Sequence, residues 1–258
     1  TVTLTNTSAS GTRVYGGYVA AAPPIPTVLN VSSNTMEISN TAEKKCGVST
    51  EKSTKTDTST EADPISTSSN SVTITGSQVE GVYGGVGQIG SAKGNIVTIT
   101  DSSVEMEAVG GETGYMMNWI TQPGQLKDAE NNQVIVNGSS TIGTVVGGEA
   151  AAANTFDEKY GEVQTSGKSS GNTVTINDGT VKDSVLGGHS AMSDAIGNTV
   201  NIAGGIIGTE SSGTGEADDN AIAGGFAEKG QANNNTVNIT IAGGFAEKGQ
   251  ANNNTVNI

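Results

Sequence analysis

Residues 171–202 read GNTVTINDGTVKDSVLGGHSAMSDAIGNTVNI, and this stretch contains every part of a unit that recurs along the chain. An Asn opens a short run in which polar and apolar residues alternate, and a second apolar run ends in Gly-Gly. After nine further residues, the next Asn begins the alternating run again. Alternation with a period of two is typical of a β-strand that buries one face. The stretch therefore predicts short strands joined by tight turns.

The same unit extends over nearly the whole chain. Asn-led strands begin at residues 34, 70, 95, 132, 172, 198, 235 and 254, and residues 1–5 repeat the strand without its Asn. Gly-Gly pairs follow at 16–17, 84–85, 110–111, 147–148, 187–188, 224–225 and 243–244, whereas the strand from Asn34 has none. An uninterrupted copy is about 25 residues long and holds three short extended segments, which predicts a coil of a parallel β-helix. We expect an all-β chain in which residues 1–258 form a single β-solenoid, itself a segment of a longer chain.

The alternation also predicts which side chains are buried. The apolar members of four Asn-led strands should face inward, namely Val72 and Ile74, Val97 and Ile99, Val174 and Ile176, and Val200 and Ile202. Thr73, Thr98, Thr175 and Asn201 should face outward. The recurring Asn is expected to bond to its equivalents above and below, as amides do in strand stacks. The paired glycines are expected to provide positive φ and close approach of stacked backbones.

The chain ends in a literal repetition. IAGGFAEKGQANNNTVNI fills residues 222–239 and, after Thr240, fills 241–258 again. A coil that contacts only its neighbours tolerates such copying. However, the coil from Asn235 reaches its first Gly after eight residues instead of 14 or 15. Either the last coil is narrower, or the duplicated 18 residues are not natural.

Composition narrows the function classes. The net charge is −14 and Arg13 is the one arginine, which argues against nucleic acid and anionic membrane surfaces as partners. A single cysteine, Cys46, excludes an intrachain disulfide, and a single histidine, His189, gives no support to a zinc site. No apolar run approaches the roughly 20 residues that span a bilayer. We therefore predict no metal, no cofactor and no membrane insertion of this segment.

Departures from the repeat suggest where a partner binds. Residues 40–69 form a Ser/Thr-rich insertion that is expected to be irregular, and 208–220 form an acidic loop. The long corner loops at 112–131 and 149–171 replace the usual nine-residue connection and hold many of the few aromatic residues. Insertions confined to one corner often form the binding face of a solenoid. The candidate partner-binding residues are Tyr115, Met116, Met117, Trp119, Phe156 and Tyr160, although such side chains can instead pack the loop against the rod.

The run at 171–202 resembles the repeats in the passenger regions of large surface proteins of Gram-negative bacteria, the autotransporter and filamentous-haemagglutinin-like adhesins of type V secretion. The resemblance spans nearly all of the chain. It implies a right-handed β-helix, export with an N-terminal signal, and a C-terminal outer-membrane barrel elsewhere in the parent protein. It also implies an extracellular or cell-surface location, with glycans or proteins of host or bacterial surfaces as partners.

Three functions compete at this level. We favour an adhesin or surface stalk that carries loops away from a cell. A self-assembling fibre is the alternative, because the opening strand TVTLT matches the closing strand NTVNI and would allow end-to-end association. A polysaccharide-cleaving enzyme is the third, since Asp101 and Asp178 occupy equivalent positions and Glu105, Glu107 and Asp183 lie nearby in sequence. We expect no catalytic residues, because the two aspartates are two coils apart.

Overall fold

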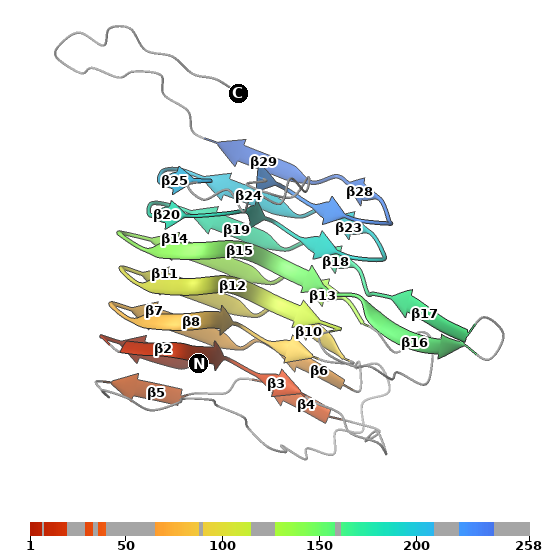
Figure 1. Cartoon of the computed structure of the whole chain (residues 1–258), viewed down its shortest axis with the longest axis horizontal. Helices are drawn as coiled ribbons and strands as arrows, with labels where there is room; N and C mark the ends of the chain where they lie inside the picture. The colour runs from red at the N-terminus through yellow and green to blue at the C-terminus, as the bar shows by residue number, and fades with distance from the viewer. Residues whose placement is uncertain are drawn as a thin grey trace, which may run out of the picture.

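The computed structural model describes residues 1–6, 8–19, 29–32, 36–39, 65–87, 90–114, 127–157, 161–208 and 222–239. Within these ranges the chain is all-β, with three parallel sheets and one antiparallel hairpin, and it contains no helix (Figure 1). None of the described residues lies in a helix that could cross a membrane. The arrangement is compatible with a β-helix.

The first sheet contains the Asn-led strands, in the order β29-β24-β19-β14-β11-β7-β1-β5. Its strands are β1 (Val2–Thr5), β5 (Met36–Ser39), β7 (Ser71–Thr75), β11 (Ile96–Thr100), β14 (Gln133–Asn137), β19 (Thr173–Ile176), β24 (Thr199–Ile202) and β29 (Thr236–Ile239). Equivalent residues of neighbouring copies pair, as Val72 does with Val97 and Val174 with Val200. Equivalent residues of successive copies therefore stack on one another along this sheet.

The second sheet has the order β28-β23-β18-β13-β10-β6-β4 and precedes the Asn-led strands in each unit. Its strands are β4 (Leu29–Ser32), β6 (Ile65–Ser68), β10 (Ser91–Lys93), β13 (Ala129–Glu130), β18 (Ser169–Ser170), β23 (Ala195–Ile196) and β28 (Ala232–Asn233). The segment 40–69, which sequence predicts to be irregular, thus ends in an ordered strand over residues 65–68, while residues 40–64 lie outside the described part.

The third sheet carries the Gly-Gly pairs and has the order β2-β8-β12-β15-β20-β25 along its main path. These strands are β2 (Ser8–Tyr15), β8 (Gln78–Tyr83), β12 (Ser103–Thr113), β15 (Thr141–Ala150), β20 (Thr180–Val181) and β25 (Ile206–Ile207). Shorter strands complete it: β3 (Tyr18–Val19), β9 (Val86–Gly87), β21 (Val185–Leu186), β22 (His189–Ser190), β26 (Ile222–Ala223) and β27 (Phe226–Ala227). The antiparallel hairpin consists of β16 (Ala153–Asp157) and β17 (Gly161–Thr165).

The predicted inward side chains form the core. Val72, Ile74, Val97, Ile99, Val174, Ile176 and Val200 are 0% exposed and Ile202 is 8% exposed. Val14, Val82, Val145 and Val185 of the third sheet join the same cluster. Thr73, Thr98, Thr175 and Asn201, in contrast, are partly exposed. Aliphatic side chains of moderate size fill this interior, so the chain builds it without buried aromatic rings in this cluster.

A ladder of asparagines runs along one edge of the first sheet, as predicted. The backbone N–H and the Nδ2 of each Asn donate to the Oδ1 of the Asn on the next strand, at distances between 2.9 and 3.2 Å. The members are Asn70, Asn95, Asn132, Asn172, Asn198 and Asn235. From Asn95 onward, each Nδ2 also donates to a carbonyl of the second sheet. The buried amides are thereby satisfied, which a stable interior requires.

The sequence prediction for the Gly-Gly pairs is half wrong. None of the glycines in the described pairs at 16–17, 84–85, 110–111, 147–148, 187–188 and 224–225 has a positive φ. Positive φ angles recur instead at the residue before each ladder Asn, where Ser69, Gly94, Asn131, Gly171, Gly197 and Asn234 have φ between 54° and 64°. Close approach is what the pairs provide: a Cβ on Gly84 would collide with the carbonyl oxygen of Gly110, and one on Gly85 with the Asn95 side chain. The glycines therefore make room for the next strand and for the ladder.

A second ladder, of serines, was not predicted. The backbone N–H of Ser77 donates to Oγ of Ser102 at 3.1 Å, and that of Ser102 donates to Oγ of Ser140 at 3.3 Å. Each hydroxyl in turn donates to a carbonyl of the strand before it, at 2.7–2.8 Å. Both turns that flank a strand of the first sheet are thus held to the neighbouring copy by side chains as well as by the backbone.

The strand from Asn34 does not take its place in sequence order. β1 pairs directly with β7, and β5 lies on the opposite edge of β1, so that Val2 is flanked by Met36 and Val72. Likewise, β4 lies outside β6 in the second sheet. The chain therefore folds back and covers the first edge of two sheets, a cap that the sequence reading did not anticipate. The opening strand 1–5 is paired on both sides, which excludes the particular joint between it and the closing strand that end-to-end stacking required.

Candidate functional site

The predicted partner-binding residues lie almost wholly beyond what the structure describes. Tyr115, Met116, Met117, Trp119 and Tyr160 are outside the described residues, and for Phe156, in β16, the backbone alone is described. The described residues do fix where the loops depart. The hairpin β16–β17 projects sideways from the stack (Figure 1).

The loops depart from one column of the third sheet. Glu112 and Thr113 at the end of β12 pair with Glu149 and Ala150 at the end of β15. The insertions over 115–126 and 153–165 begin directly after these two ends. The column continues along the stack through Tyr18, Val86, Glu112, Glu149, His189 and Phe226. We call these six residues the wall column.

Tyrosines pack at the first end of this wall. Tyr15 and Tyr83 are stacked, with ring centroids 4.9 Å apart and planes 14° apart. Tyr18 meets Tyr15 edge to face at 5.5 Å. Val86, Val109 and Val146 belong to the same small cluster, which is separate from the main core. The third sheet therefore has a partly apolar outer face beside the insertions.

Carboxyl groups are embedded in the same face. Glu112 is 4% exposed, and burial raises its pKa well above the usual range, an effect that the charges of Glu149 and Glu107 reinforce. Burial likewise raises the pKa of Glu107, although a hydrogen bond from the Tyr83 hydroxyl opposes the shift. For Tyr83, burial raises the pKa first, and the contact with Glu107 adds to it. Burial and the neighbouring carboxylates thus raise the pKa of Glu112 and favour its neutral form.

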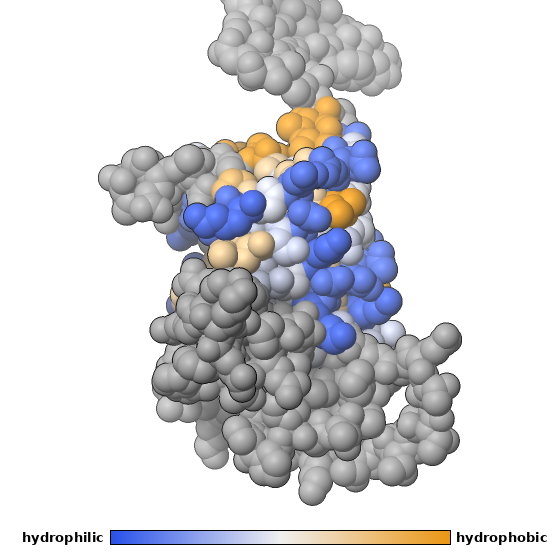
Figure 2. Space-filling view, turned by 90° about the vertical axis from the view of Figure 1, so that its right-hand side faces the viewer, coloured by the Kyte–Doolittle hydropathy of each residue, from blue (hydrophilic) through white to orange (hydrophobic). Residues whose placement is uncertain are grey.

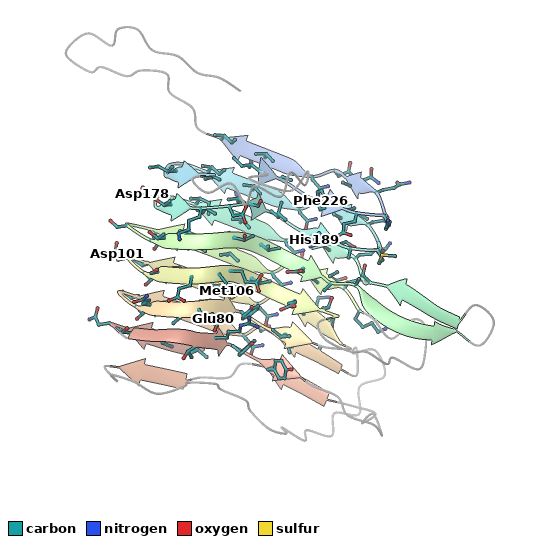
Figure 3. All side chains as sticks on the ribbon, viewed as in Figure 1. Glu80, Asp101, Met106, Asp178, His189 and Phe226 are labelled. Carbon is teal, nitrogen blue, oxygen red and sulfur yellow. The ribbon has the colours of Figure 1, made fainter. Side chains whose placement is uncertain are left out.

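His189 occupies the next position of the wall column. Its Nδ1 lies 3.6 Å from Oε1 of Glu149, and its Nε2 lies 3.2 Å from Oε1 of Glu228. Burial disfavours the charged ring, but the two carboxylates outweigh burial and raise the pKa of His189. Phe226 lies beside it with centroids 5.5 Å apart, and Figure 3 shows the two side chains together on one side of the sheet.

Arg13 lies at the opposite end of this face from His189. Its guanidinium contacts Oε1 of Glu80 at 3.3 Å and the sulfur of Met106 at 3.7 Å. Its positive charge also lowers the pKa of Glu107 and of Glu112, against the larger effect of burial. The one arginine of the chain therefore offsets part of the negative charge of the wall.

The two aspartates that suggested an enzyme do not lie on this face of the stack. Asp101 and Asp178 lie on the opposite side of the stack from His189 (Figure 3). Asp101 accepts a hydrogen bond from the Ser139 backbone at 2.9 Å, and Asp178 accepts one from the Gly179 backbone at 2.8 Å. Both side chains therefore stabilise turns.

A polar groove of about 410 Å³ beside Asp101 is lined mainly by serine, asparagine and glycine, with Gln78 and Thr141. In the part of the chain that the structure describes, no three His, Cys, Asp or Glu side chains are grouped so as to hold a metal ion.

Sequence reasoning missed the wall column, although one signal was present. The pairs at 110–111 and 147–148 are both followed by Glu, whereas the other described pairs are followed by Tyr18, Val86, His189 and Phe226. Aligning the copies on Gly-Gly places these side chains in one row. The burial of Glu112 could not be read this way, because it depends on what packs around the row.

Searches for related proteins found no matching family model, no matching curated protein and no matching solved structure.

Proposed function

We propose that this chain is a segment of an extracellular surface stalk, a right-handed β-helix of about 25 residues per uninterrupted coil that presents loops for attachment. The observation that carries the proposal is the register of the stacked copies, with side-chain ladders at the turns that flank the first sheet and two insertions, 115–126 and 153–165, leaving from a single column. Ladders of this kind favour a rigid body, because every copy is tied to the next by buried hydrogen bonds.

The spacing of the ladder supports both a common coil and its insertions. Successive ladder asparagines are 25, 37, 40, 26 and 37 residues apart. Two intervals match the uninterrupted unit, and the longer ones contain residues 115–126, 153–165 and 209–221. Extra length is accommodated beside the stack while the ladder contact stays the same, as expected for a scaffold whose loops vary.

The contact face should be the wall column together with the loops that leave it. Tyr18, Glu149, His189 and Phe226 are all partly exposed. Aromatic rings beside carboxylates are suited to sugar rings and to protein hot spots, since rings stack while carboxylates accept hydrogen bonds. The candidate loop residues Tyr115, Met116, Met117, Trp119, Phe156 and Tyr160 would extend the same surface. Surface glycans or proteins of host or bacterial cells are the proposed partners.

The proposal is tested by measuring the binding of a variant with a shortened loop. Replacing 112–131 would disturb β12 and β13, so the shortening is confined to 115–126, which lie between them. The variant should keep the far-ultraviolet circular dichroism of the parent and lose binding to glycan arrays, matrix proteins and cells. Trp119→Ala should weaken binding, while shortening 209–221, which leave from a different place, serves as the matched control.

Unchanged binding by the 115–126 variant would place the adhesive contact elsewhere. Loss of binding in both loop variants, with the fold retained, would point to the wall itself, which His189→Ala and Phe226→Ala would then locate. The proposed surface location has its own check: the parent protein should be accessible to antibodies or protease on intact cells.

A further inference from the structure

The last described unit, residues 222–239, packs on the stack with little apolar burial. No residue of its strands β26, β27, β28 and β29 is fully buried. Ile222, Val237 and Ile239 are 38%, 40% and 42% exposed. Figure 2 shows hydrophobic side chains gathered at this end of the described surface. Because apolar burial contributes less here than in the middle of the stack, a single polar contact has a larger share in holding this unit in place.

His189 joins this unit to the two copies before it. It lies in β22, which pairs with β15 at Glu149 and with β27 at Phe226. Its Nδ1 lies 3.6 Å from Oε1 of Glu149, and its Nε2 lies 3.2 Å from Oε1 of Glu228, two residues after Phe226. Each ring nitrogen therefore faces a carboxylate of a different copy, and one of the two carboxylates belongs to the last unit.

We propose that protonation of His189 stabilises the docking of residues 222–239 on the stack, so that this unit is held closed in mildly acidic solution and opens more readily as the pH rises. A protonated imidazole donates from both nitrogens, whereas a neutral imidazole has a single N–H. The neutral ring can therefore donate to Glu149 or to Glu228, and its other nitrogen presents a lone pair to the remaining carboxylate. Loss of the proton thus removes one of the two attractive contacts and replaces it by repulsion.

The surroundings of the ring strengthen its interaction with the last unit. The side chains of His189 and Glu149 are 19% and 22% exposed and that of Glu228 is 45% exposed, so water screens the first ion pair less than the second. The Phe226 ring, on the same unit as Glu228, has its centroid 5.5 Å from that of His189 (Figure 3). An aromatic ring at this distance attracts a cation. Both contacts from the last unit therefore favour the charged imidazole.

The charged groups that act on this ring come from the copies on both sides. β15 supplies Glu149, the turn after β27 supplies Glu228, and Ser190, the other residue of β22, is uncharged. Glu112 of β12 pairs with Glu149 one strand farther along. Burial lowers the pKa of His189, but the two carboxylates outweigh burial and raise it above the ordinary value of 6.5. The docked unit thus binds the proton more tightly than the open unit, and the added stability is complete below that ordinary value and is lost as the pH rises through the folded pKa.

Hydrogen exchange of the full chain, resolved by NMR, tests the proposal at this contact. The N–H groups of Phe226 and Glu228 donate to backbone carbonyls of the preceding copy at 2.8 and 3.0 Å, so their protection reports whether the last unit is docked. The Gln133 amide, which donates to the Asn95 carbonyl at 2.8 Å in the middle of the stack, corrects for pH effects common to the whole chain. Each rate is divided by that of an unfolded peptide at the same pH, because exchange itself depends on pH.

Protection of the two reporter amides, relative to Gln133, should fall about threefold or more between pH 5.5 and pH 8.5. His189→Gln keeps a polar side chain that takes up no proton in this range, and it should abolish the pH dependence. Lys168→Gln is the matched control, because it breaks an ion pair with Asp194 at 3.7 Å elsewhere in the stack and should leave the pH dependence intact.

The titration of the ring provides a second readout. His189 is the one histidine of the chain, so the ring resonances report its pKa directly, which should lie above 6.5 in the parent and be lower in Glu228→Gln. A pKa at or below 6.5 in the parent would overturn the proposal, as would protection of the reporter amides that does not change with pH. An equal pH dependence in His189→Gln would also overturn it. The first two outcomes are measured on the parent chain and do not depend on the folding of a variant.

Discussion

The same tetrapeptide, Thr-Val-Asn-Ile, occurs in β24 and in β29, and the two copies have different surroundings. In β24, Val200 is 0% exposed and Ile202 is 8% exposed, whereas Val237 and Ile239 of β29 are 40% and 42% exposed. The backbones pair in register, so the difference does not come from local conformation. It comes from the strand on the other side, because β24 lies between β19 and β29. Stability in this molecule is thus supplied by neighbouring copies, as nearest-neighbour models of repeat proteins require.

The two ends of the stack extend this comparison. At the first end, the chain folds back so that β5 covers β1 and β4 covers β6. At the last end, Ile206, Ile222, Val237 and Ile239 are exposed within the described residues. An uncovered parallel edge exposes both hydrogen-bonding groups and the end of the core, and proteins commonly protect such edges. The two ends of the described stack therefore differ in whether a further strand covers the core strands.

A charge in the middle of the core should give the largest effect. Ile176→Asp places a carboxylate where the side chain is fully buried, and the cost of burying an unpaired charge should unfold the protein or open it locally. Thr175→Asp, one residue away on the outer face, is the matched control and should cost far less. Thermal melts followed by circular dichroism measure both. Equal losses would contradict the inward assignment of the strand.

Removing one ladder amide should have the next largest effect. Asn132→Ala removes the acceptor of the Asn95 backbone N–H and one bond each of Asn95 Nδ2 and Asn172 Oδ1, and a buried group left unsatisfied costs about 1–3 kcal/mol. The control is Asn137→Ala, an Asn on the outer face that also bonds to its neighbour but is partly exposed. Denaturant melts give the two free energies of unfolding. A cost no greater for Asn132 than for Asn137 would show that the ladder does not stabilise the stack.

A smaller effect should separate the two Thr-Val-Asn-Ile copies. In a chain that ends at residue 239, Val200→Ala removes two buried carbon atoms, which corresponds to roughly 2 kcal/mol of unfolding free energy. Val237→Ala removes the same atoms from a half-exposed site and should cost less than half as much. Comparable costs in denaturant melts would mean that β29 is buried to the same degree as β24.

Protonation of Glu112 should have the smallest effect on stability, and the sign of that effect is defined. Burial raises the pKa of Glu112 above the ordinary value of 4.5, so the folded state binds this proton more tightly than the unfolded state does. Stability should therefore fall as pH rises from about 4.5 through the folded pKa. Glu112→Gln keeps the shape, removes the titration and should stabilise the protein at pH 7 relative to the parent. Melts of both proteins between pH 4 and pH 8 check this, and parallel curves would contradict a raised pKa of Glu112.

Much of the fold follows from local pattern. Alternation in the Asn-led strands identifies the buried Val and Ile correctly, and the recurrent Asn predicts the ladder, because both depend on residues that repeat in every copy. The position of β5 could not be predicted this way. Its residues Met-Glu-Ile-Ser match the strand pattern, but pattern does not say on which edge of β1 a strand pairs. The prediction for the Gly-Gly pairs was wrong in part, because glycine is favoured both where backbones approach closely and where φ is positive.

The candidate site was less accessible from sequence. The loop residues were chosen for composition, and all but the backbone of Phe156 lie outside the described part. The wall column combines residues up to 208 positions apart, from Tyr18 to Phe226, that register alone brings together. The raised pKa values of Glu112 and His189 depend on burial and on neighbouring charges, and neither property belongs to a single copy of the repeat.

Hydrogen exchange of the two identical strands tests the central claim most directly. In a chain that ends at residue 239, amides of 199–202 should exchange at least tenfold more slowly than those of 236–239, because β24 has a neighbour on each side and β29 has one. Mass spectrometry of the overlapping peptides gives both rates in one experiment. Equal exchange in the two strands would contradict the claim that each copy is stabilised by the copies beside it.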